Sequence, residues 1–600
     1  MNLLNKCRNI KHPRTFLICV ATLILFFKSI YFHALTFSEF PRFECDMALT
    51  LYKFYMAKLL CPILISSILL LTSKKYWVTL CMLFADLLCL ANIIYFKCYD
   101  LFLTIDDVLL VGNMDGAWTS IEAYLDIRLL MFPLSTLLWI ALPISLKNHN
   151  ILNIKTIQWV CVCGGGGGVI FLLLIVGYVN NILIYDYTDA CRIAKFSNRP
   201  KDIPFTFKKY CRLPFLGLAM HSIDNRTYVY EQSILSYFPS VVIAFVRDCG
   251  KKVELTAHDI SLVEKLTNSD TNNFHIEPTH SVIIILVESL ESWVINQCID
   301  GVELTPFLNK LTSSQKILYC DKIKSQTLAG NSGDGQMIVN SGLLPLKHGV
   351  ACMSFYSNIY PNIANLYSSS YTINPWPHIW NQTVMSKRYG YKQLLEPAPN
   401  EEWQDADVLN ESSRAIDNAT SKFCLMGITV SMHSPFNRVS NQLNLSKATP
   451  ELLRKYMECV NYTDKCIESF VYSQISDSIR ENTTIVITSD HTIFKPAMLI
   501  DYVDYATHKN LSIASKENYC PLIIYSPQIE GNVQIDELCY QMDIFPTILH
   551  LIGCEDYYWK GFGVNLLDSV TRRNRPITEK EAYELSDKLI RSNCFGGCNN

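Results

Sequence analysis

Four side chains that could form a metal-assisted nucleophilic site follow three strand-like runs of this 600-residue sequence. They are Glu288, Ser332, Asp490 and His491. Two carboxylates and an imidazole are a set of oxygen and nitrogen ligands that suits a divalent cation such as Mn²⁺, Mg²⁺ or Zn²⁺. The serine hydroxyl could complete a four-coordinate site, and a divalent cation acidifies a hydroxyl that it binds. These residue types therefore predict attack by Ser332 on an electrophile such as a phosphorus atom.

Ser332 also lies where the sequence predicts the start of a helix. A turn at residues 328–331 precedes it, and apolar residues at helical spacing follow as far as Leu346. We expect Ser332 at the N-cap, where free backbone N–H groups and the positive end of the helix dipole favour an anion or a developing alkoxide. Serine is a common capping residue, so a purely structural role would also explain it.

Apolar runs that alternate with helical patterns indicate the elements that position these side chains. The strand-like runs are Ser281–Val287, Lys322–Thr327, Phe423–Val430, Thr484–Thr488 and Leu522–Tyr525. The helical patterns include Pro306–Leu311, Glu451–Ser473 and Met542–Ile552. Near-continuous apolar strands separated by helices indicate an α/β fold with a buried, mostly parallel sheet. Such sheets place ligands at the carboxyl ends of their strands, so we expect the four side chains to meet there.

The first 185 residues are rich in apolar side chains and contain five segments close to the length that crosses a bilayer. The segments are Phe16–Leu35, Ala57–Thr72, Tyr76–Phe96, Leu129–Leu146 and Ile157–Leu183. The first has a basic leader but no A-x-A-like cleavage site, so we interpret it as a retained anchor. Basic residues at 6–14, 74–75 and 147–155 fall on one side if the segments alternate. The positive-inside rule then places the N-terminus in the cytoplasm and everything after Tyr185 outside.

Polar residues inside the third segment are a separate candidate site. Asp86 and Asn92 both lie there. A carboxylate within a membrane span is costly enough to suggest a function, and hydrogen bonding between helices explains it equally well.

Composition and pattern divide the chain into four regions. We expect a transmembrane domain of five helices over residues 1–184, a juxtamembrane linker over 185–279, a catalytic α/β domain over 280–570 and a polar surface tail over 571–600. The formal net charge of −3 gives no indication of a nucleic-acid partner. The 23 cysteines show no CxxC pair or zinc-finger spacing.

Longer motifs surround the candidate residues. They are VESLESW and LTPFLNKL, GNSGDGQ with NSGLLPL around Ser332, ITVSMHSPF at Ile428–Phe436, SDH at Ser489–His491, and CPLIIYSP, QMDIFPTIL and GFGVNLL. Together they resemble the lipoteichoic-acid synthase (phosphoglycerol transferase) branch of the alkaline phosphatase/sulfatase superfamily. The resemblance extends from about Ser281 to Leu567 and implies five membrane helices followed by an extracytoplasmic sulfatase-like domain. It implies Glu288, Asp490 and His491 as ligands of one Mn²⁺-type ion, with Ser332 as nucleophile.

The same resemblance implies residues that line the substrate site. His433 would donate a proton to a leaving group or contact a phosphate. His378 and Trp380, in the motif WPHIWNQ, would lie beside the substrate, although simple packing would also explain this loop.

Two positions depart from the family pattern. The usual nucleophile is threonine, and Ser332 keeps its hydroxyl but lacks the methyl group. The family's arginine two residues after the tryptophan contacts glycerol phosphate, and this chain has Gln382 there. A neutral amide recognises phosphate poorly, so we expect Lys387 or Arg388 to compensate if phosphoglycerol is the donor group.

The resemblance implies a membrane-anchored, metal-dependent phosphotransferase. Ser332 would take a phosphoglycerol- or phosphoethanolamine-type headgroup from a phospholipid, and a glycan or lipid-sugar hydroxyl would then accept it with help from His433. Sulfate-ester hydrolysis is not expected, because the chain lacks the C-x-P-x-R-like motif of true sulfatases. A phosphoethanolamine transferase usually has a threonine-rich nucleophile motif and a more histidine-rich centre. A phosphodiesterase that uses water, and an envelope-binding protein without turnover, are the alternatives.

Overall fold

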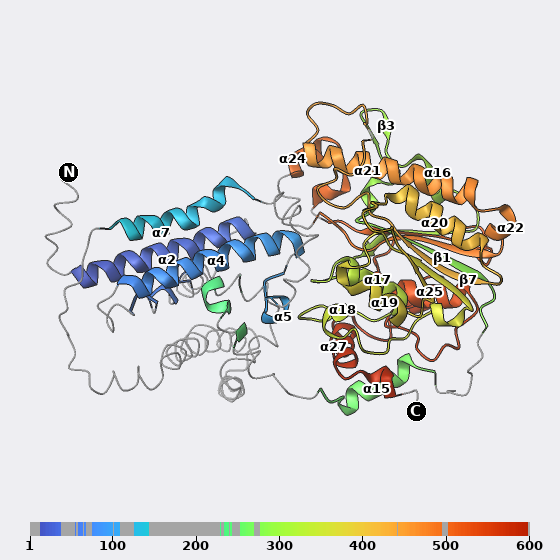
Figure 1. The fold of residues 1–600 in the computed structure, drawn as a ribbon, viewed down its shortest axis with the longest axis horizontal. Coiled ribbons are helices and arrows are strands. Elements are labelled where there is room, and N and C mark those ends of the chain that lie inside the picture. Colours follow the sequence, from blue (N-terminus) through green and yellow to red (C-terminus); the bar gives the residue numbers. More distant parts are fainter. Residues whose placement is uncertain are drawn as a thin grey trace, which may run out of the picture. The chain divides into compact units, whose positions relative to one another are not determined.

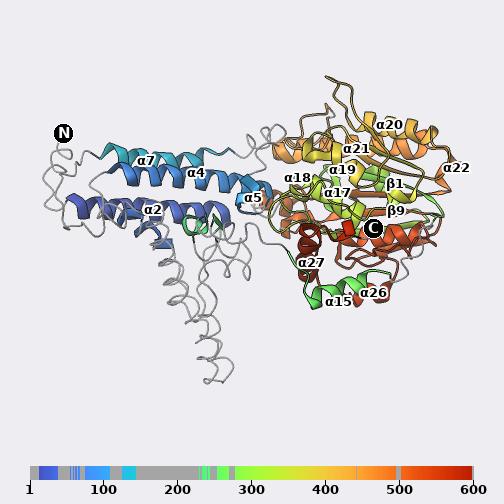
Figure 2. The same ribbon diagram turned by 60° about the horizontal axis from the view of Figure 1, so that its bottom comes forward.

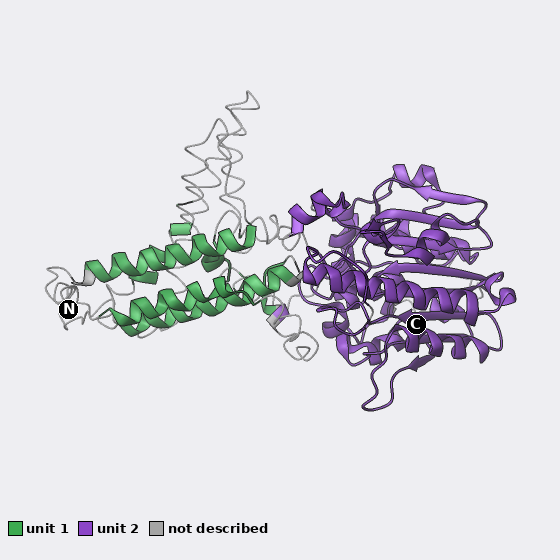
Figure 3. Ribbon diagram, turned by 90° about the horizontal axis from the view of Figure 1, so that it is seen from above, with its two compact units in different colours: residues 1–105, 124–251 green, residues 106–123, 252–600 purple. Residues whose placement is uncertain are grey.

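The computed structural model describes the C-terminal half of the chain almost completely and the apolar N-terminal part less fully. The longer described ranges are residues 13–37, 75–99, 101–108, 125–142, 253–268 and 277–597, with gaps at 441, 495–501 and 516. Short pieces between 55 and 67 and between 229 and 242 are also described. The chain divides into two units, residues 1–105 with 124–251 and residues 106–123 with 252–600 (Figure 3).

Three apolar helices of the first unit pack side by side (Figures 1 and 2). They are α2 (Pro13–Phe37), α4 (Lys75–Tyr99) and α7 (Met131–Ala141), the last preceded by the short 3₁₀ helix η2 (Ile127–Leu130). Within α2 and α4, Thr15–Phe37 and Lys75–Lys97 are long and apolar enough to cross a membrane. The predicted segment 157–183 lies outside the described residues and 57–72 lies only partly within them, so the number of five spans stays a prediction.

A buried charged group joins these three helices. Lys28 on α2 forms an ion pair with Asp86 on α4. The Lys28 ammonium also donates to the carbonyl of Phe132 at 2.7 Å and to the hydroxyl of Thr136 at 3.0 Å, both on α7. Thr136 donates in turn to Asp86 at 2.5 Å. Asp86 is thus hydrogen-bonded between helices, one of the two explanations that its sequence position allowed.

The second unit is built on a nine-stranded sheet with the order β10-β4-β9-β8-β1-β7-β5-β6, and β11 beside β4. The strands are β1 (Ser281–Val287), β4 (Ile317–Lys324), β5 (Ser369–Ile373), β6 (Gln393–Leu395), β7 (Phe423–Ile428), β8 (Thr483–Ser489), β9 (Cys520–Tyr525), β10 (Asn532–Ile535) and β11 (Cys539–Tyr540). Every pairing is parallel except those of β9, which runs antiparallel to β4 and β8. The mostly parallel α/β sheet is therefore confirmed, and the run 522–525 is its antiparallel member. A separate pair, β2 (Cys298–Ile299) and β3 (Val302–Glu303), is antiparallel.

Helices cover both faces of this sheet (Figure 1). On one side lie α16 (Pro306–Thr312), α20 (Asp405–Asp417) and α21 (Glu451–Glu468), and on the other α17 (Ser332–Ser341) and α25 (Ile544–Leu551). Shorter helices are α18 (Ala351–Ser354), α19 (Gln382–Arg388), α22 (Asp477–Arg480), α24 (Val503–His508) and α26 (Ser569–Arg573). Because β1, β7 and β8 are buried at every residue, none of them alternates polar and apolar side chains, and the polar residues of β8 are the small Thr and Ser.

The last thirty residues are not the surface tail that their polarity suggested. They contain α27 (Glu579–Arg591), whose Ala582, Leu585 and Leu589 are buried. The spacing of these three residues places them on one helical face, and overall polarity masks that pattern. Lys588 on α27 donates to Asp259 at 2.7 Å, which joins it to α15 (Ala257–Leu266), and both views show the two helices side by side (Figures 1 and 2). The second unit therefore begins within the region predicted as a linker.

Candidate active site

Two neighbouring strands deliver the candidate ligands to the same edge of the sheet. In the parallel register of β1 and β8, Val287 lies opposite Ser489. Glu288 follows the first strand and Asp490 and His491 follow the second, so their backbones leave the sheet together. Carboxyl ends of parallel strands are the usual position of a ligand site in such a fold.

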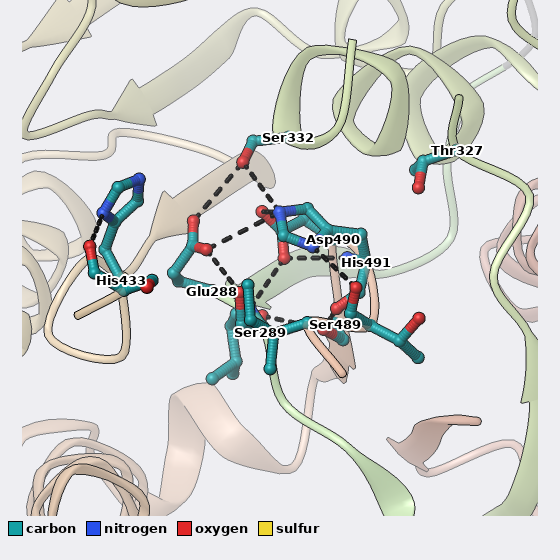
Figure 4. Close-up of polar contacts among 12 residues, drawn as sticks. Glu288, Ser289, Thr327, Ser332, His433, Ser489, Asp490 and His491 are labelled. Carbon is teal, nitrogen blue, oxygen red and sulfur yellow. Dashed lines mark hydrogen bonds and ion pairs between the residues drawn. The ribbon is translucent and has the colours of Figure 1, made fainter. Parts of the chain in front are cut away.

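The four side chains lie together at this edge (Figure 4). Ser332 Oγ is 3.3 Å from Glu288 Oε2 and 3.3 Å from His491 Nε2. His491 Nε2 is 3.6 Å from Glu288 Oε1 and 3.5 Å from Asp490 Oδ2. One ligand atom from each of Glu288, Asp490 and His491 falls within 4.8 Å of the other two, which is the spacing of groups that can share one cation.

The turn before Ser332 is fixed by its own hydrogen bonds. Asn331, with φ of 37°, is the N-cap, and Ser332 is the first helical residue rather than the cap that we expected. The carboxylate of Asp334 accepts N–H bonds from Leu328 and Gly330, each at 2.9 Å. The N–H groups of residues 333–335 already donate to the carbonyls of residues 330 and 331. An anion beside Ser332 would therefore be stabilised by the helix dipole and not by hydrogen bonds from these N–H groups.

Close approach of α17 to the segment that carries Asp490 and His491 requires a glycine. A Cβ on Gly335 would overlap the carbonyl of Asp490. Gln541 holds the same carbonyl from the other direction, since its Nε2 donates to Asp490 O at 2.7 Å. The helix that carries Ser332 is thus packed directly on the backbone that carries Asp490 and His491.

The buried carboxylates provide a test of whether a cation fits. Asp490 Oδ1 accepts N–H bonds from Ser289 and His491, whereas its buried Oδ2 accepts no hydrogen bond from the described residues. Burial, and then the charge of Asp490, raise the pKa of Glu288 well above its usual range. Two adjacent buried carboxylates are stable in the ionised form only with a compensating cation. The residues fit a divalent cation with oxygen and nitrogen ligands, and Mn²⁺ among these stays a prediction.

A second carboxylate in the VESLESW motif, which the sequence analysis did not assign, supports this centre. Glu291 Oε1 accepts N–H bonds from Ile493 at 2.9 Å and Phe494 at 2.8 Å, just beyond His491. Its Oε2 accepts from Trp293 Nε1 at 2.8 Å. Burial raises the pKa of Glu291 to about 7. The sequence could have indicated this role only through the presence of a second glutamate in the motif. The amides that Glu291 binds belong to residues 202 and 203 positions away, so local sequence does not reveal them.

His433 lies beside the cluster on the side of Glu288 (Figure 4). Its Nδ1 donates to Ser434 O at 2.8 Å, which leaves Nε2 as an acceptor, and its ring meets Trp376 edge-on with centroids 5.1 Å apart. Burial lowers the pKa of His433 to about 4, so the imidazole is neutral at ordinary pH. Among the described residues it makes no hydrogen bond or ion pair to the four clustered side chains, and its catalytic role stays a prediction.

The other predicted substrate residues are distributed unevenly around the site. Trp380 lies against the start of α17, because a Cβ on Gly333 would be 3.1 Å from Trp380 Cβ. Gln382 is buried and its Nε2 donates to Trp380 O at 3.1 Å. His378 is exposed, and within the described part of the chain no hydrogen bond, ion pair or ring contact joins it to the cluster.

Comparison with known proteins gives one family match and several relatives. Residues 280–554 match the Sulfatase family. Lipoteichoic acid synthase 1 of Bacillus subtilis (strain 168) is 24% identical over 546 residues, which cover 83% of this chain and 77% of that protein. Lipoteichoic acid synthase of Staphylococcus aureus (strain NCTC 8325 / PS 47) is 21% identical over 536 residues, which cover 85% of this chain and 77% of that protein.

Two solved structures with a similar fold are, by name, a lipoteichoic acid synthase and a phosphoethanolamine transferase. The lipoteichoic acid synthase LtaP from Listeria monocytogenes has 18% identity and a TM-score of 0.47, covering 57% of this chain and 98% of that one. The integral membrane protein lipooligosaccharide phosphoethanolamine transferase A from Neisseria meningitidis has 11% identity and a TM-score of 0.47, covering 90% and 95%. The family match and the curated relatives confirm the resemblance that the sequence motifs carry. The Sulfatase match over residues 280–554 and the curated relatives support a lipoteichoic-acid-synthase-like enzyme, a phosphotransferase of the alkaline phosphatase/sulfatase superfamily.

Proposed function

We propose that this protein transfers a phosphoglycerol- or phosphoethanolamine-type headgroup from a membrane phospholipid to an envelope glycan or lipid-sugar. The observation that carries the proposal is the position of Ser332 Oγ, 3.3 Å from both Glu288 Oε2 and His491 Nε2 at the start of α17. Relatives that are named lipoteichoic acid synthases align with most of the chain, which supports a lipid donor and an envelope acceptor.

In the first step, Ser332 attacks the phosphorus of the donor phosphodiester. The Oγ–P bond forms as the P–O bond to diacylglycerol breaks, and the diacylglycerol oxygen takes up a proton. A divalent cation held by Glu288, Asp490 and His491 would supply the positive charge that acidifies the hydroxyl and offsets charge on the phosphate. The N-terminal end of α17 adds a partial positive charge at the same place.

In the second step, the acceptor hydroxyl displaces Ser332 from phosphorus. The new O–P bond forms, the bond to Oγ breaks, and Oγ regains a proton. His433 is the group that we assign to accept the proton of the acceptor hydroxyl, because its Nε2 is unprotonated while Nδ1 donates to Ser434 O. His378 and Trp380 stay proposed substrate contacts, and Trp380 is the better supported because it lies against Gly333 next to the nucleophile.

The proposal includes the membrane topology. Helices α2 and α4 are long and apolar enough to cross the bilayer, and the sequence supports three further spans. An odd number of crossings, with the N-terminus in the cytoplasm, would hold the catalytic domain outside the cell membrane. Phospholipid donors are concentrated at that membrane, which favours a lipid headgroup as substrate.

The direct test is lipid cleavage by the full-length protein reconstituted in liposomes with Mn²⁺. Liposomes of phosphatidylglycerol and of phosphatidylethanolamine are compared, and released diacylglycerol is measured with and without a glycolipid acceptor. We expect release from one of the two lipids and its loss, by at least about 1000-fold, in Ser332→Ala. Ser332→Thr is the matched control, because it keeps the hydroxyl and should retain activity.

The outcomes separate the proposed reaction from its alternatives. Headgroup transfer to the acceptor supports a transferase, whereas equal diacylglycerol release with water as the only acceptor would replace it with a phosphodiesterase. Wild-type activity that survives Ser332→Ala would contradict the proposed nucleophile. Tight acceptor binding without release from either lipid would indicate an envelope-binding protein.

A further inference from the structure

Arg438 is a half-buried cation that forms no ion pair with any described residue. Its guanidinium carbon lies 4.0 Å from the centre of the Trp376 ring, in a stacked cation–π contact. Within the described part of the chain, the guanidinium makes no ion pair or hydrogen bond. Arg575, also largely buried, shows the usual arrangement, since both its terminal nitrogens donate to Asp543 at 2.6 and 2.8 Å. A cation held out of bulk water without a counter-ion is costly unless an anion joins it.

The loop that carries Arg438 is held firmly at its backbone. Gln404 Nε2 donates to Arg438 O at 2.9 Å. Two residues earlier, the buried ring of Phe436 packs on Tyr456 with centroids 5.2 Å apart, and Phe436 N donates to His433 O at 3.0 Å. These contacts fix the backbone that carries Arg438, and stacking on Trp376 fixes the plane of the guanidinium.

Arg438 belongs to the same surroundings as the proposed catalytic groups. The indole on which it stacks is the one that meets His433 edge-on, 5.1 Å between centroids. Burial lowers the pKa of Arg438, and the negative charges of Glu402, Asp405 and then Glu288 raise it. The positive charge of Arg438 in turn adds to the effect of burial in lowering the pKa of His433. Arg438 is thus electrostatically coupled to Glu288 of the cluster and to the neighbouring His433.

The residues expected to supply a phosphate contact are poorly placed for it. Gln382 is neutral, and one of the two N–H donors of its amide is already given to Trp380 O at 3.1 Å. Lys387 and Arg388 lie exposed in the last turn of α19, and Arg388 Nε donates to Tyr356 O at 3.0 Å. A phosphate bound near Ser332 needs a cation besides the metal ion, because phosphate recognition relies on charge-assisted hydrogen bonds.

We propose that Arg438, stacked on Trp376, is the residue that binds a phosphate group of the substrate beside Ser332. A guanidinium offers two parallel N–H donors to two phosphate oxygens, and the indole face keeps those donors in one plane. The phosphate belongs either to the phosphodiester of the lipid donor or to a phosphate already attached to the acceptor. The assignment rests on the proposed transfer reaction for its substrate, but the binding site itself can be tested without turnover.

The binding test uses Ser332→Ala full-length protein, so that no reaction occurs, with Mn²⁺ and glycerol 1-phosphate as the probe. Affinity is measured by calorimetry for this protein and for the same protein carrying Arg438→Gln, Arg438→Lys or Arg414→Gln. We expect Arg438→Gln to bind the probe about 10- to 100-fold more weakly. Arg438→Lys should have an intermediate affinity, because lysine keeps the charge but lacks the two parallel N–H donors of a guanidinium. Arg414 is an exposed arginine paired with Glu411, so its variant should bind normally.

The activity test uses the same Arg438 variants with an intact Ser332. Arg438→Gln should raise KM for the phospholipid more than it lowers kcat, which a general loss of folding would not do. A higher KM in the absence of acceptor identifies the donor phosphate, and a higher KM for the acceptor alone identifies the acceptor phosphate. Either result supports the assignment, and Arg438→Lys serves as a folded reference if the glutamine variant is unstable.

Failure of this assignment is distinguishable from failure of the proposed function. Wild-type lipid cleavage combined with unchanged probe affinity and KM in Arg438→Gln would overturn the role of Arg438 alone. Probe binding that depends on Arg438, in a protein that cleaves no lipid, would overturn the transfer reaction and leave the phosphate site intact.

Discussion

The hydroxyl of Ser332 lies 3.3 Å from Nε2 of His491, although the two residues are 159 positions apart in the sequence. Glu288 is at the same distance from this hydroxyl on the other side. Three separate segments therefore meet around one oxygen atom, and the packing of Gly335 on the Asp490 carbonyl holds two of them in contact. The following predictions test this arrangement and the groups that support it.

Removal of the cation should abolish lipid cleavage and lower the melting temperature of the catalytic domain. In Glu288→Gln, which keeps the side-chain shape, we expect metal affinity to fall by at least about 10-fold. The metal-free variant should be more stable than the metal-free wild type by about 1 kcal/mol, because two buried carboxylates no longer repel each other. Thermal unfolding with Mn²⁺ and with a chelator measures both effects. A chelator that changes neither activity nor stability would argue against the metal centre.

Glu291→Gln is expected to lower the free energy of unfolding by about 1–3 kcal/mol. The glutamine carbonyl can still accept from the Ile493 and Phe494 amides, but its NH₂ group would face the indole N–H of Trp293, which has then lost its acceptor. Adding Trp293→Phe removes the opposing donor and should restore part of the loss. Denaturant unfolding of the two single variants and the double variant gives the coupling.

The same carboxyl group should impose a pH dependence on stability. The pKa of Glu291 is about 7 in the folded protein and its usual value is 4.5, so the folded state binds more protons between these values. Stability should therefore fall as pH rises from about 4.5 to 7, by up to ~3 kcal/mol from this group. Glu291→Gln should flatten that part of the profile, and an unchanged profile would contradict the assignment.

His433→Gln should slow transfer to the acceptor by about 100-fold or more, since a positioned base of this kind contributes 10²- to 10⁴-fold. Because burial lowers the pKa of His433 to about 4, the imidazole should stay competent until the pH falls to that region. The rate of transfer to the acceptor, measured as a function of pH for wild type and His433→Gln, tests both expectations. If His433→Gln slows cleavage of the phospholipid without acceptor by the same factor, His433 acts in the first step instead.

Asp86→Leu should destabilise the helical unit by about 3 kcal/mol or more, because the buried ammonium of Lys28 loses its ionic partner. The double variant Lys28→Met with Asp86→Leu removes both charges and should recover most of that loss. Thermal unfolding in detergent measures both. A double variant that stays inactive in lipid cleavage despite restored stability would indicate a functional role for the pair.

Local sequence was enough to predict a mostly parallel sheet, five of its nine strands and most of the cluster, although the run Lys322–Thr327 overlaps β4 only at residues 322–324. Short runs without polar–apolar alternation mark β1 and the centre of β8, and the residues that follow them leave the sheet at its carboxyl edge. Glu288, Asp490 and His491 could therefore be placed together, because buried runs separated by helical patterns predict parallel strands whose carboxyl ends share one edge. The spacing of Ala582, Leu585 and Leu589 carried similar information about α27, which the polarity of the last thirty residues concealed.

Only the tertiary structure decided which distant groups become partners. Nothing local to the run 520–525 indicates that β9 is antiparallel, since strand direction depends on the path of the chain between strands. The stacking of Arg438 on Trp376 and the hydrogen bonds from Ile493 and Phe494 to Glu291 each join residues far apart in sequence. Sequence alone thus determined the residue types and the edge of the sheet at which they gather. Folding determined their neighbours, because burial and hydrogen bonding depend on side chains that approach only in the packed molecule.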